Sequence, residues 1–326
     1  MPNLRSDKND FIERITRIIE ENISNEQFGV SELADSIGMS RSNLLRKVKK
    51  YTDLSVSQFI RNIRLKLAKE LLEEIGLYDI TDMPMDLFVS ALGATLIEEP
   101  LKNSDGKIIR GNTKTLIKIN SEILYEEKKR FTIAHEVGHY LLHDKLDLAV
   151  HNENSNTLNW FKNIEHQAKK GIQEYEANDF ASELLMPESV FRKFIEHKPF
   201  SPSLIKEISN RFKTSLTSVV YRLITLDVFP LLVVFISDGI VRYWRKSPDL
   251  KGWLKDVTKL SPPEDSVAKE YIDADYEFIY KGDDKAQEIE RSTWFKIYED
   301  QEDSDFMEYC IPTKQYKTII SIIWEE

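Results

Sequence analysis

Residues 130–143 read RFTIAHEVGHYLLH, and this stretch decides how the rest of the chain is interpreted. On a helix, residues four apart lie on one face, so His135 and His139 can bind the same metal ion. Glu136 lies beside them, placed to reach a water on that ion rather than the ion itself. The residues around them are largely apolar, which predicts a buried helix that holds the ligands in a dry site.

This arrangement is typical of zinc-dependent peptide hydrolysis. Zinc would act as a Lewis acid and lower the pKa of its bound water. Glu136 would take the proton of that water and deliver it to the leaving amine, as a catalytic base. The sequence therefore predicts a metallopeptidase with one Zn²⁺ per chain, although manganese can use the same ligands. A chance occurrence of the five-residue pattern is the competing interpretation, in a chain with only six histidines.

A catalytic zinc also needs a third protein ligand, and residues 174–187, EYEANDFASELLMP, offer one on a second helix. Glu174 and Asn178 share one face of that helix, so Glu174 is the predicted third ligand and Asn178 a partner that orients a ligand histidine. Glu176 is the alternative ligand, but two helical residues turn it about 160° from Glu174. Alanines on the same helix, and Gly138 on the first, predict that the two helices approach closely.

Three further histidines could also provide a ligand: His143, His151 and His166. No supporting spacing singles one of them out. His143 lies four residues beyond His139, which is too far along the helix to reach the same ion.

The paired motifs resemble those of the ImmA/IrrE metallopeptidases, a branch of the gluzincin-type zinc proteases, and the resemblance covers about residues 78–227. It implies His135, His139 and Glu174 as metal ligands and Glu136 as catalytic base. It also implies a protein substrate, a DNA-binding repressor or antitoxin that is cut to switch on stress-response or mobile-element genes. By analogy with such proteases, TLIKIN at 115–120 is expected to be the edge strand to which substrate adds.

The N-terminal region predicts a helix-turn-helix. Residues 30–51, VSELADSIGMSRSNLLRKVKKY, read as a helix, a tight turn at Gly38 and a second helix capped by Ser40, with a long helix behind them. The stretch resembles the first half of an AraC-type DNA-binding module, which implies a recognition helix carrying Arg41, Ser42, Asn43, Arg46 and Lys47. Because that family normally has two such units and this chain has one, DNA binding is expected to need a homodimer, or the head holds a protein partner.

The charge distribution points to the same region. The chain has a net charge of −10, yet nine Lys/Arg and one acidic residue lie between Gly38 and Lys69. A basic patch in an acidic protein indicates a local anionic partner, such as DNA. The competing interpretation is a solvated helix face.

These patterns predict an α+β, multidomain protein in three parts. Residues 1–75 form the helix-turn-helix head, and 76–227 a mostly helical, zincin-like protease core with a small sheet. Residues 228–326 hold strands such as LLVVFI and TIISIIW, and resemble the C-terminal α/β sensor-like, regulatory domain of longer family members. No residue there identifies a ligand.

The composition of the chain indicates the cellular compartment in which the protein is expected to work. No stretch approaches the ~18 apolar residues of a membrane span, the N-terminus lacks the apolar core of a secretory signal, and Cys310 is the single cysteine. A cytoplasmic protein without membrane contact is expected. Two functions follow: a regulatory endopeptidase, or a DNA-binding transcriptional regulator that uses a protease-like fold as a non-catalytic platform. Glu136 favours the first, because binding alone needs no general base.

Overall fold

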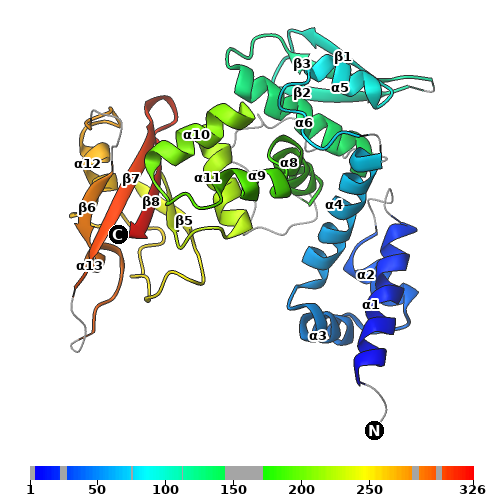
Figure 1. Cartoon of the computed structure of the whole chain (residues 1–326), viewed down its shortest axis with the longest axis horizontal. Helices are drawn as coiled ribbons and strands as arrows, with labels where there is room; N and C mark the ends of the chain where they lie inside the picture. The colour runs from blue at the N-terminus through cyan, green and yellow to red at the C-terminus, as the bar shows by residue number, and fades with distance from the viewer. Residues whose placement is uncertain are drawn as a thin grey trace. The chain divides into compact units, whose positions relative to one another are not determined.

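The computed structural model describes residues 4–22, 28–74, 76–111, 113–143, 172–280, 286–298 and 303–326. The chain divides into two compact units, Met1–Pro187 and Glu188–Glu326 (Figure 1). Helices and two separate sheets are present, so the predicted α+β, multidomain fold class is confirmed. His151 and His166 lie outside the described residues. No helix within the described ranges is long and apolar enough to cross a membrane.

The first unit begins with a helical head. Its four helices are α1 (Leu4–Glu20), α2 (Val30–Ser36), α3 (Arg41–Thr52) and α4 (Val56–Glu74). Apolar residues at helical spacing on each of them meet in one core, which includes Ile15, Ile19, Leu33, Leu44, Val48 and Phe59. The amphipathic helices thus pack their apolar faces together into a small helical bundle.

The turn between α2 and α3 has the chemistry that the sequence predicts. Gly38 has φ +71°, a left-handed conformation that glycine adopts without a Cβ penalty. The N–H of Met39 donates to the carbonyl of Ala34 at 2.9 Å. The Ser40 hydroxyl accepts from the N–H of Asn43 at 3.3 Å and caps α3.

The rest of the first unit contains a three-stranded sheet and two long helices. Its elements are α5 (Met85–Ala91), β1 (Ala94–Glu99), β2 (Gly106–Arg110), β3 (Thr115–Asn120), α6 (Glu126–Leu142) and α8 (Ile172–Leu185). The strand order is β1-β3-β2, with β1 parallel and β2 antiparallel to β3. The inner face of the sheet and the apolar faces of α6 and α8 share a core that includes Phe88, Ile117, Ile119, Ile133, Val137 and Phe180.

The expectation that TLIKIN is an edge strand is wrong. These residues form β3, the central strand, in which Ile117 pairs with Leu96 on one side and with Ile108 on the other. Ile117 and Ile119 are fully buried, as the apolar positions of a central strand should be. The alternation of TLIKIN identifies a strand, but alternation does not tell a central strand from an edge.

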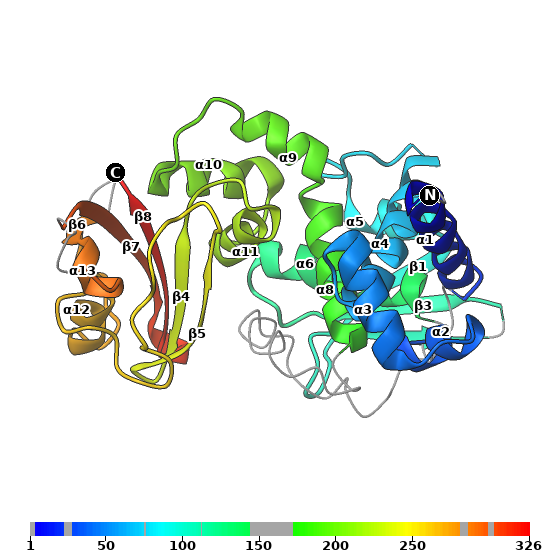
Figure 2. The same ribbon diagram turned by 90° about the horizontal axis from the view of Figure 1, so that it is seen from below.

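The second unit holds three helices followed by an antiparallel sheet. The helices are α9 (Glu188–Ile195), α10 (Pro202–Phe212) and α11 (Leu216–Leu226). The five strands are β4 (Leu232–Ser237), β5 (Ile240–Lys246), β6 (Gln287–Glu290), β7 (Asp305–Thr313) and β8 (Thr318–Glu325), in the order β5-β4-β8-β7-β6 (Figure 2). Helices α12 (Val267–Asp273) and α13 (Arg291–Trp294) contribute to its core, which includes Tyr271 and Trp294.

Candidate metal centre

The site is built where α6 and α8 approach each other closely. A Cβ on Gly138 would lie 3.0 Å from the Cα of Ala177 and 3.1 Å from its carbonyl oxygen. A side chain at this position would press against the backbone of Ala177, so glycine lets α6 and α8 approach closely. The predicted close approach of the two helices is confirmed, and it outweighs the ~1 kcal/mol that glycine costs inside a helix.

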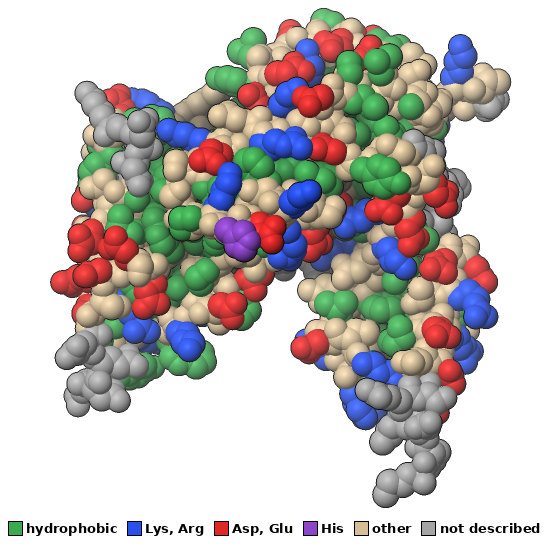
Figure 3. All heavy atoms as spheres, in the orientation of Figure 1, with side chains coloured by type: hydrophobic (Ala, Val, Ile, Leu, Met, Phe, Trp, Pro, Cys, Tyr) green, Lys and Arg blue, Asp and Glu red, His purple; other side chains and the backbone are tan. Residues whose placement is uncertain are grey.

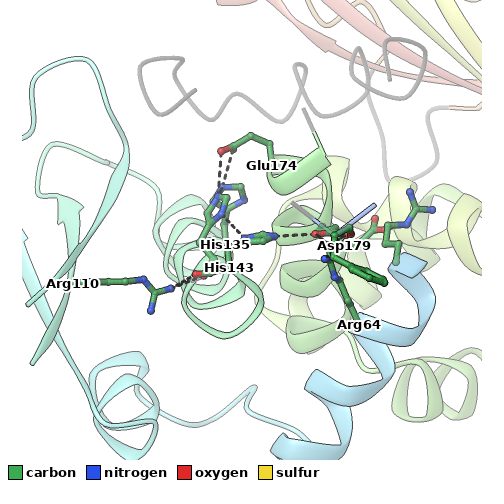
Figure 4. A network of polar contacts seen from close by, with 10 residues as sticks. Arg64, Arg110, His135, His143, Glu174 and Asp179 are labelled. Atoms are coloured by element: carbon green, nitrogen blue, oxygen red, sulfur yellow. Dashed lines mark hydrogen bonds and ion pairs between the residues drawn. The ribbon is translucent and has the colours of Figure 1, made fainter. Parts of the chain in front are cut away.

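Three side chains from these two helices converge at one point (Figure 4). The Nε2 atoms of His135 and His139 lie 3.0 Å apart. The two carboxylate oxygens of Glu174 lie 3.2 Å and 3.3 Å from these nitrogens. Both imidazoles are buried, whereas the Glu174 side chain is 21% exposed. The group has the composition and the proximity of a two-histidine, one-carboxylate metal site with a side open to solvent.

The protonation states of His139 and Glu174 suit a cation, whereas burial of His135 is outweighed by the hydrogen bond and charge of Glu174, which raise the pKa of His135 above its ordinary value. Burial disfavours the charged form of His139 and lowers its pKa to about 3, so this imidazole keeps its lone pair. Burial also opposes the charge of Glu174, but the hydrogen bonds and charges of His135 and His139 outweigh it and lower its pKa below the ordinary value. A neutral imidazole and an ionised carboxylate are the forms in which these groups bind a divalent metal.

Asn178 lies behind the first histidine, on the side away from the convergence point. Its Oδ1 is 2.8 Å from Nδ1 of His135. Because Nε2 of His135 faces the other two side chains, Nδ1 carries the proton and donates it to Asn178. This is the contact expected of a residue that orients a ligand histidine.

Glu136 is buried beside the three converging side chains, and one of its oxygens is unsatisfied. Its Oε2 has no hydrogen-bond partner among the described residues. Burial raises the pKa of Glu136 to about 7. A Cβ on Gly106 would lie 2.5 Å from Glu136 Oε1, so glycine is needed for β2 to pass this carboxylate. A water held at a metal would supply the partner that Oε2 lacks, and the residues present therefore fit zinc.

The structure places Glu174 and Glu176 in different surroundings. Glu174 faces the histidine pair, whereas Glu176 accepts two hydrogen bonds from Arg64 of α4 at 2.9 and 3.1 Å. Glu176 also lies 3.0 Å from Nε2 of His143, a residue that caps the end of α6. The contacts favour Glu174 over the alternative ligand, as the helical phase predicts.

Sequence reasoning missed two arginines that support the site. Arg64 and Glu176 are 112 residues apart, so no local spacing connects them. Arg110 of β2 donates to the carbonyls of His139 at 3.0 Å, Tyr140 at 3.1 Å and His143, and so satisfies acceptors at the C-terminus of α6. A lone arginine in a strand gives no sequence signal for this role.

Part of the basic stretch 38–69 has a partner within the chain. Arg61, Arg64 and Lys69 of α4 pair with Asp179, Glu176 and Glu183 of α8. The remaining basic residues lie mostly on α3 and are largely exposed. On the face drawn in Figure 3, basic and acidic side chains are interspersed over the head. The local anionic partner that the charge pattern indicates is therefore, for these three residues, helix α8 itself.

Comparison with known proteins identifies the segment that contains both motifs. Residues 89–224 match the family model of the IrrE N-terminal-like domain, Peptidase M78. A histidine kinase P4 from Formosa agariphila is 40% identical over 62 residues, which are 19% of this chain and 4% of that protein. A Mycobacterium tuberculosis transcriptional regulator gives a TM-score of 0.49 at 13% identity, over 79% of this chain and 86% of that one. The resemblance of the paired motifs to the ImmA/IrrE metallopeptidases is thus confirmed for residues 89–224.

Proposed function

We propose that this protein is a zinc-dependent regulatory endopeptidase. The observation that carries the proposal is the convergence of His135, His139 and Glu174 beside the unsatisfied oxygen of Glu136. A site built only to hold a metal has no need of a fourth buried residue, an acid with an unused acceptor atom. One Zn²⁺ per chain is expected.

The mechanism assigns a task to each residue. His135, His139 and Glu174 would hold the zinc ion, which would supply Lewis acidity for the hydrolysis of a peptide bond by water. Glu136 accepts the proton of that water at Oε2 and later gives it to the leaving amine. Burial raises the pKa of Glu136, which helps this carboxyl to hold the proton between the two transfers. Asn178 keeps His135 in the tautomer that presents Nε2 to the ion.

The substrate backbone is assigned to β2. Among the described strands, β2 pairs with β3 alone, so one of its edges is unpaired there. Gly106 at its start touches Glu136, and Arg110 at its end contacts the terminus of α6. An extended protein segment that adds to this edge would pass the metal ligands. A repressor or antitoxin is the proposed substrate, following the family resemblance.

DNA binding is proposed for the head. Arg41, Ser42, Asn43 and Arg46 are exposed on α3, where a recognition helix would meet base edges and phosphates. The ammonium of Lys47 lies 4.0 Å above the ring of Phe11, which makes it the member of the predicted set that is most engaged within the protein. A single unit of this kind offers few phosphate contacts, so a homodimer is the proposed DNA-binding form.

The decisive experiment is cleavage of a protein partner in cells. The chain is co-expressed with proteins encoded by neighbouring genes, and a cleavage product is sought for the wild type and for Glu136→Gln. Glu122→Gln, a change at an exposed glutamate, is the matched control. We expect a product with the wild type and the control and none with Glu136→Gln. If Glu136→Gln leaves the biological output unchanged, the alternative holds: a DNA-binding regulator whose protease-like fold is a platform.

The head is tested by the salt dependence of binding to DNA. Arg46→Ala should lower the slope of log affinity against log salt by about 1, the value for one lost phosphate contact. Arg242→Ala, which removes an exposed arginine from β5, should leave the slope unchanged. If the wild type, Arg46→Ala and Arg242→Ala give the same slope of log affinity against log salt, α3 does not belong to the proposed DNA interface. A protein with these partners is proposed to work in the cytoplasm, with residues 228–326 as a regulatory domain.

A further inference from the structure

A continuous series of buried polar contacts runs from the N-terminal head to the ligand His139. Arg64 of α4 donates to both oxygens of Glu176 at 2.9 and 3.1 Å, and Glu176 lies 3.0 Å from Nε2 of His143. Nδ1 of His143 lies 3.0 Å from Nδ1 of His139. All four residues are at most 3% exposed. Figure 4 shows His143 between the metal ligands and Arg64.

The metal site would fix the direction of every hydrogen bond in this series. Nε2 of His139 faces the other ligands and must present a lone pair, so its proton is on Nδ1. That proton is donated to Nδ1 of His143, which places the proton of His143 on Nε2. Nε2 then donates to Glu176, an acceptor-only carboxylate that also accepts from Arg64. Each atom thus has one role, and the series supports only one tautomer of His139.

The other end of the series is anchored in the head. Nη2 of Arg64 donates to the carbonyl of Phe28 at 3.2 Å, just before α2. Phe59 and Ile60 of α4 lie in the core of the head, whereas Leu65 packs against the core that contains α6 and α8. Helix α4 lies beside α8 in both Figure 1 and Figure 2. Arg64 therefore stands where the two cores meet.

We propose that Arg64, Glu176 and His143 are positioning residues for His139, so that the metal affinity of the site depends on the docking of α4 against α8. The inference rests on the proposed metal site. A purely structural ion pair would also join the two helices, but the same helix pair offers a comparison. Arg61–Asp179 at 3.1 Å and Lys69–Glu183 at 2.8 Å join α4 to α8 as well, at other positions along the two helices.

The first test is the affinity of the full chain for Zn²⁺, measured by competition with a chelating indicator. His143→Phe keeps a ring of similar size but removes the acceptor for the Nδ1 proton of His139. We expect the affinity to fall 10- to 100-fold, as for other partners of ligand histidines. His143→Asn can place an oxygen near the position of Nδ1, and should recover most of the loss. The visible spectrum of bound Co²⁺ should change with the first variant and return with the second.

The second test separates the series from helix docking in general. Arg64→Met should weaken Zn²⁺ binding about tenfold, whereas Arg61→Met and Lys69→Met should each change it less than about twofold. If Arg64→Met fails to fold because it leaves Glu176 uncompensated, the double variant Arg64→Met/Glu176→Gln removes both charges, and the same loss of affinity is expected. Urea unfolding of the chelator-treated proteins establishes that each variant is folded.

The outcomes separate this inference from the proposed function. Zn²⁺ binding that His139→Phe weakens and His143→Phe does not would overturn the positioning series and leave the metal site intact. Equal losses for Arg64→Met, Arg61→Met and Lys69→Met would also overturn it, because docking alone would then explain the effect. A wild-type chain that binds neither Zn²⁺ nor Co²⁺ would overturn the proposed function together with the inference.

Discussion

Glu136 in the first unit and Glu308 in the second are both buried, and their surroundings differ. Glu308 on β7 of the second unit is 0% exposed and accepts from the N–H groups of Val267 and Ala268, from Trp294 Nε1 and from the Ser321 hydroxyl. Glu136 on α6 is 3% exposed, and its Oε2 has no partner in the part of the chain that the structure describes. Burial raises the pKa of both.

The comparison shows that burial alone does not identify a functional acid. The oxygens of Glu308 accept from the first turn of α12, from α13 and from β8, so this carboxylate joins elements of the second unit. The unsatisfied oxygen of Glu136 costs stability, and a bound ligand or water would complete it. We infer that Glu308 has a structural role and that Glu136 has a catalytic role. The following substitutions test this difference.

The largest effect is expected for Glu136→Gln on cleavage of the substrate found by co-expression. Loss of the proton acceptor should lower the cleavage rate by about 10²- to 10⁴-fold. Zn²⁺ affinity should stay within a few-fold of wild type, because Glu136 is not a predicted ligand. Initial rates and chelator competition measure the two quantities. A rate within tenfold of wild type would show that Glu136 is not the base.

Glu308→Ala should act on folding instead. Its removal leaves several buried donors without an acceptor, and the free energy of unfolding should fall by about 4 kcal/mol. Urea unfolding followed by tryptophan fluorescence reports on this unit, since Trp294 contacts Glu308. Ser321→Ala, which removes one of the donors, should cost only about 1 kcal/mol. A change in Zn²⁺ affinity for Glu308→Ala would contradict the purely structural role that we infer for Glu308.

The pH dependence of stability gives the next largest effect. Glu136 has a folded pKa of about 7 against an ordinary value of 4.5, so the stability linked to its proton is complete below pH 4.5 and is lost as the pH rises through 7. Gln cannot ionise. In chelator-treated protein, Glu136→Gln should match the wild type at pH 4 and exceed it by up to about 3 kcal/mol at pH 8. Urea unfolding at the two pH values measures the difference, and equal stability at pH 8 would contradict it.

The smallest change is Gly106→Ala. The new methyl would lie 2.5 Å from Glu136 Oε1 and 2.9 Å from the methyl of Thr132, so β2 or Glu136 must move. We expect a loss of about 1–3 kcal/mol in the free energy of unfolding and a slower cleavage rate. Gly29→Ala is the control, because a Cβ there meets only the end of Glu32 at 3.4 Å. Equal losses for the two variants would show that the contact with Glu136 is not tight.

Local spacing accounts for what the sequence predicted well. His135 and His139 are one helical turn apart. The opposite phases of Glu174 and Glu176 separate the carboxylate that meets these two histidines from the one that meets His143. The turn at Gly38 was also predictable, because its backbone conformation follows from residue types within a few positions. The roles of the site residues and the three-part domain division stay predictions.

Contacts between distant segments account for what was missed. TLIKIN was expected at an edge, yet it became central because both β1 and β2 pair with it. Arg61 and Lys69 were counted as part of a surface for an outside anion, and they pair instead with acidic residues more than a hundred positions away on α8. Helical periodicity shows which face of α4 is polar, but it does not show what that face meets.

Helix α4 contributes side chains to two hydrophobic cores, and this has a consequence for how such proteins can be rearranged. An exchange of the head by recombination at residue 75 would carry Arg64 and Leu65 away and leave their partners uncovered. A junction placed before Val56 would keep them. A junction before Val56 would, however, separate Phe59 and Ile60 from the core of the head, so natural or engineered chimaeras of this protein should keep both cores together with α4.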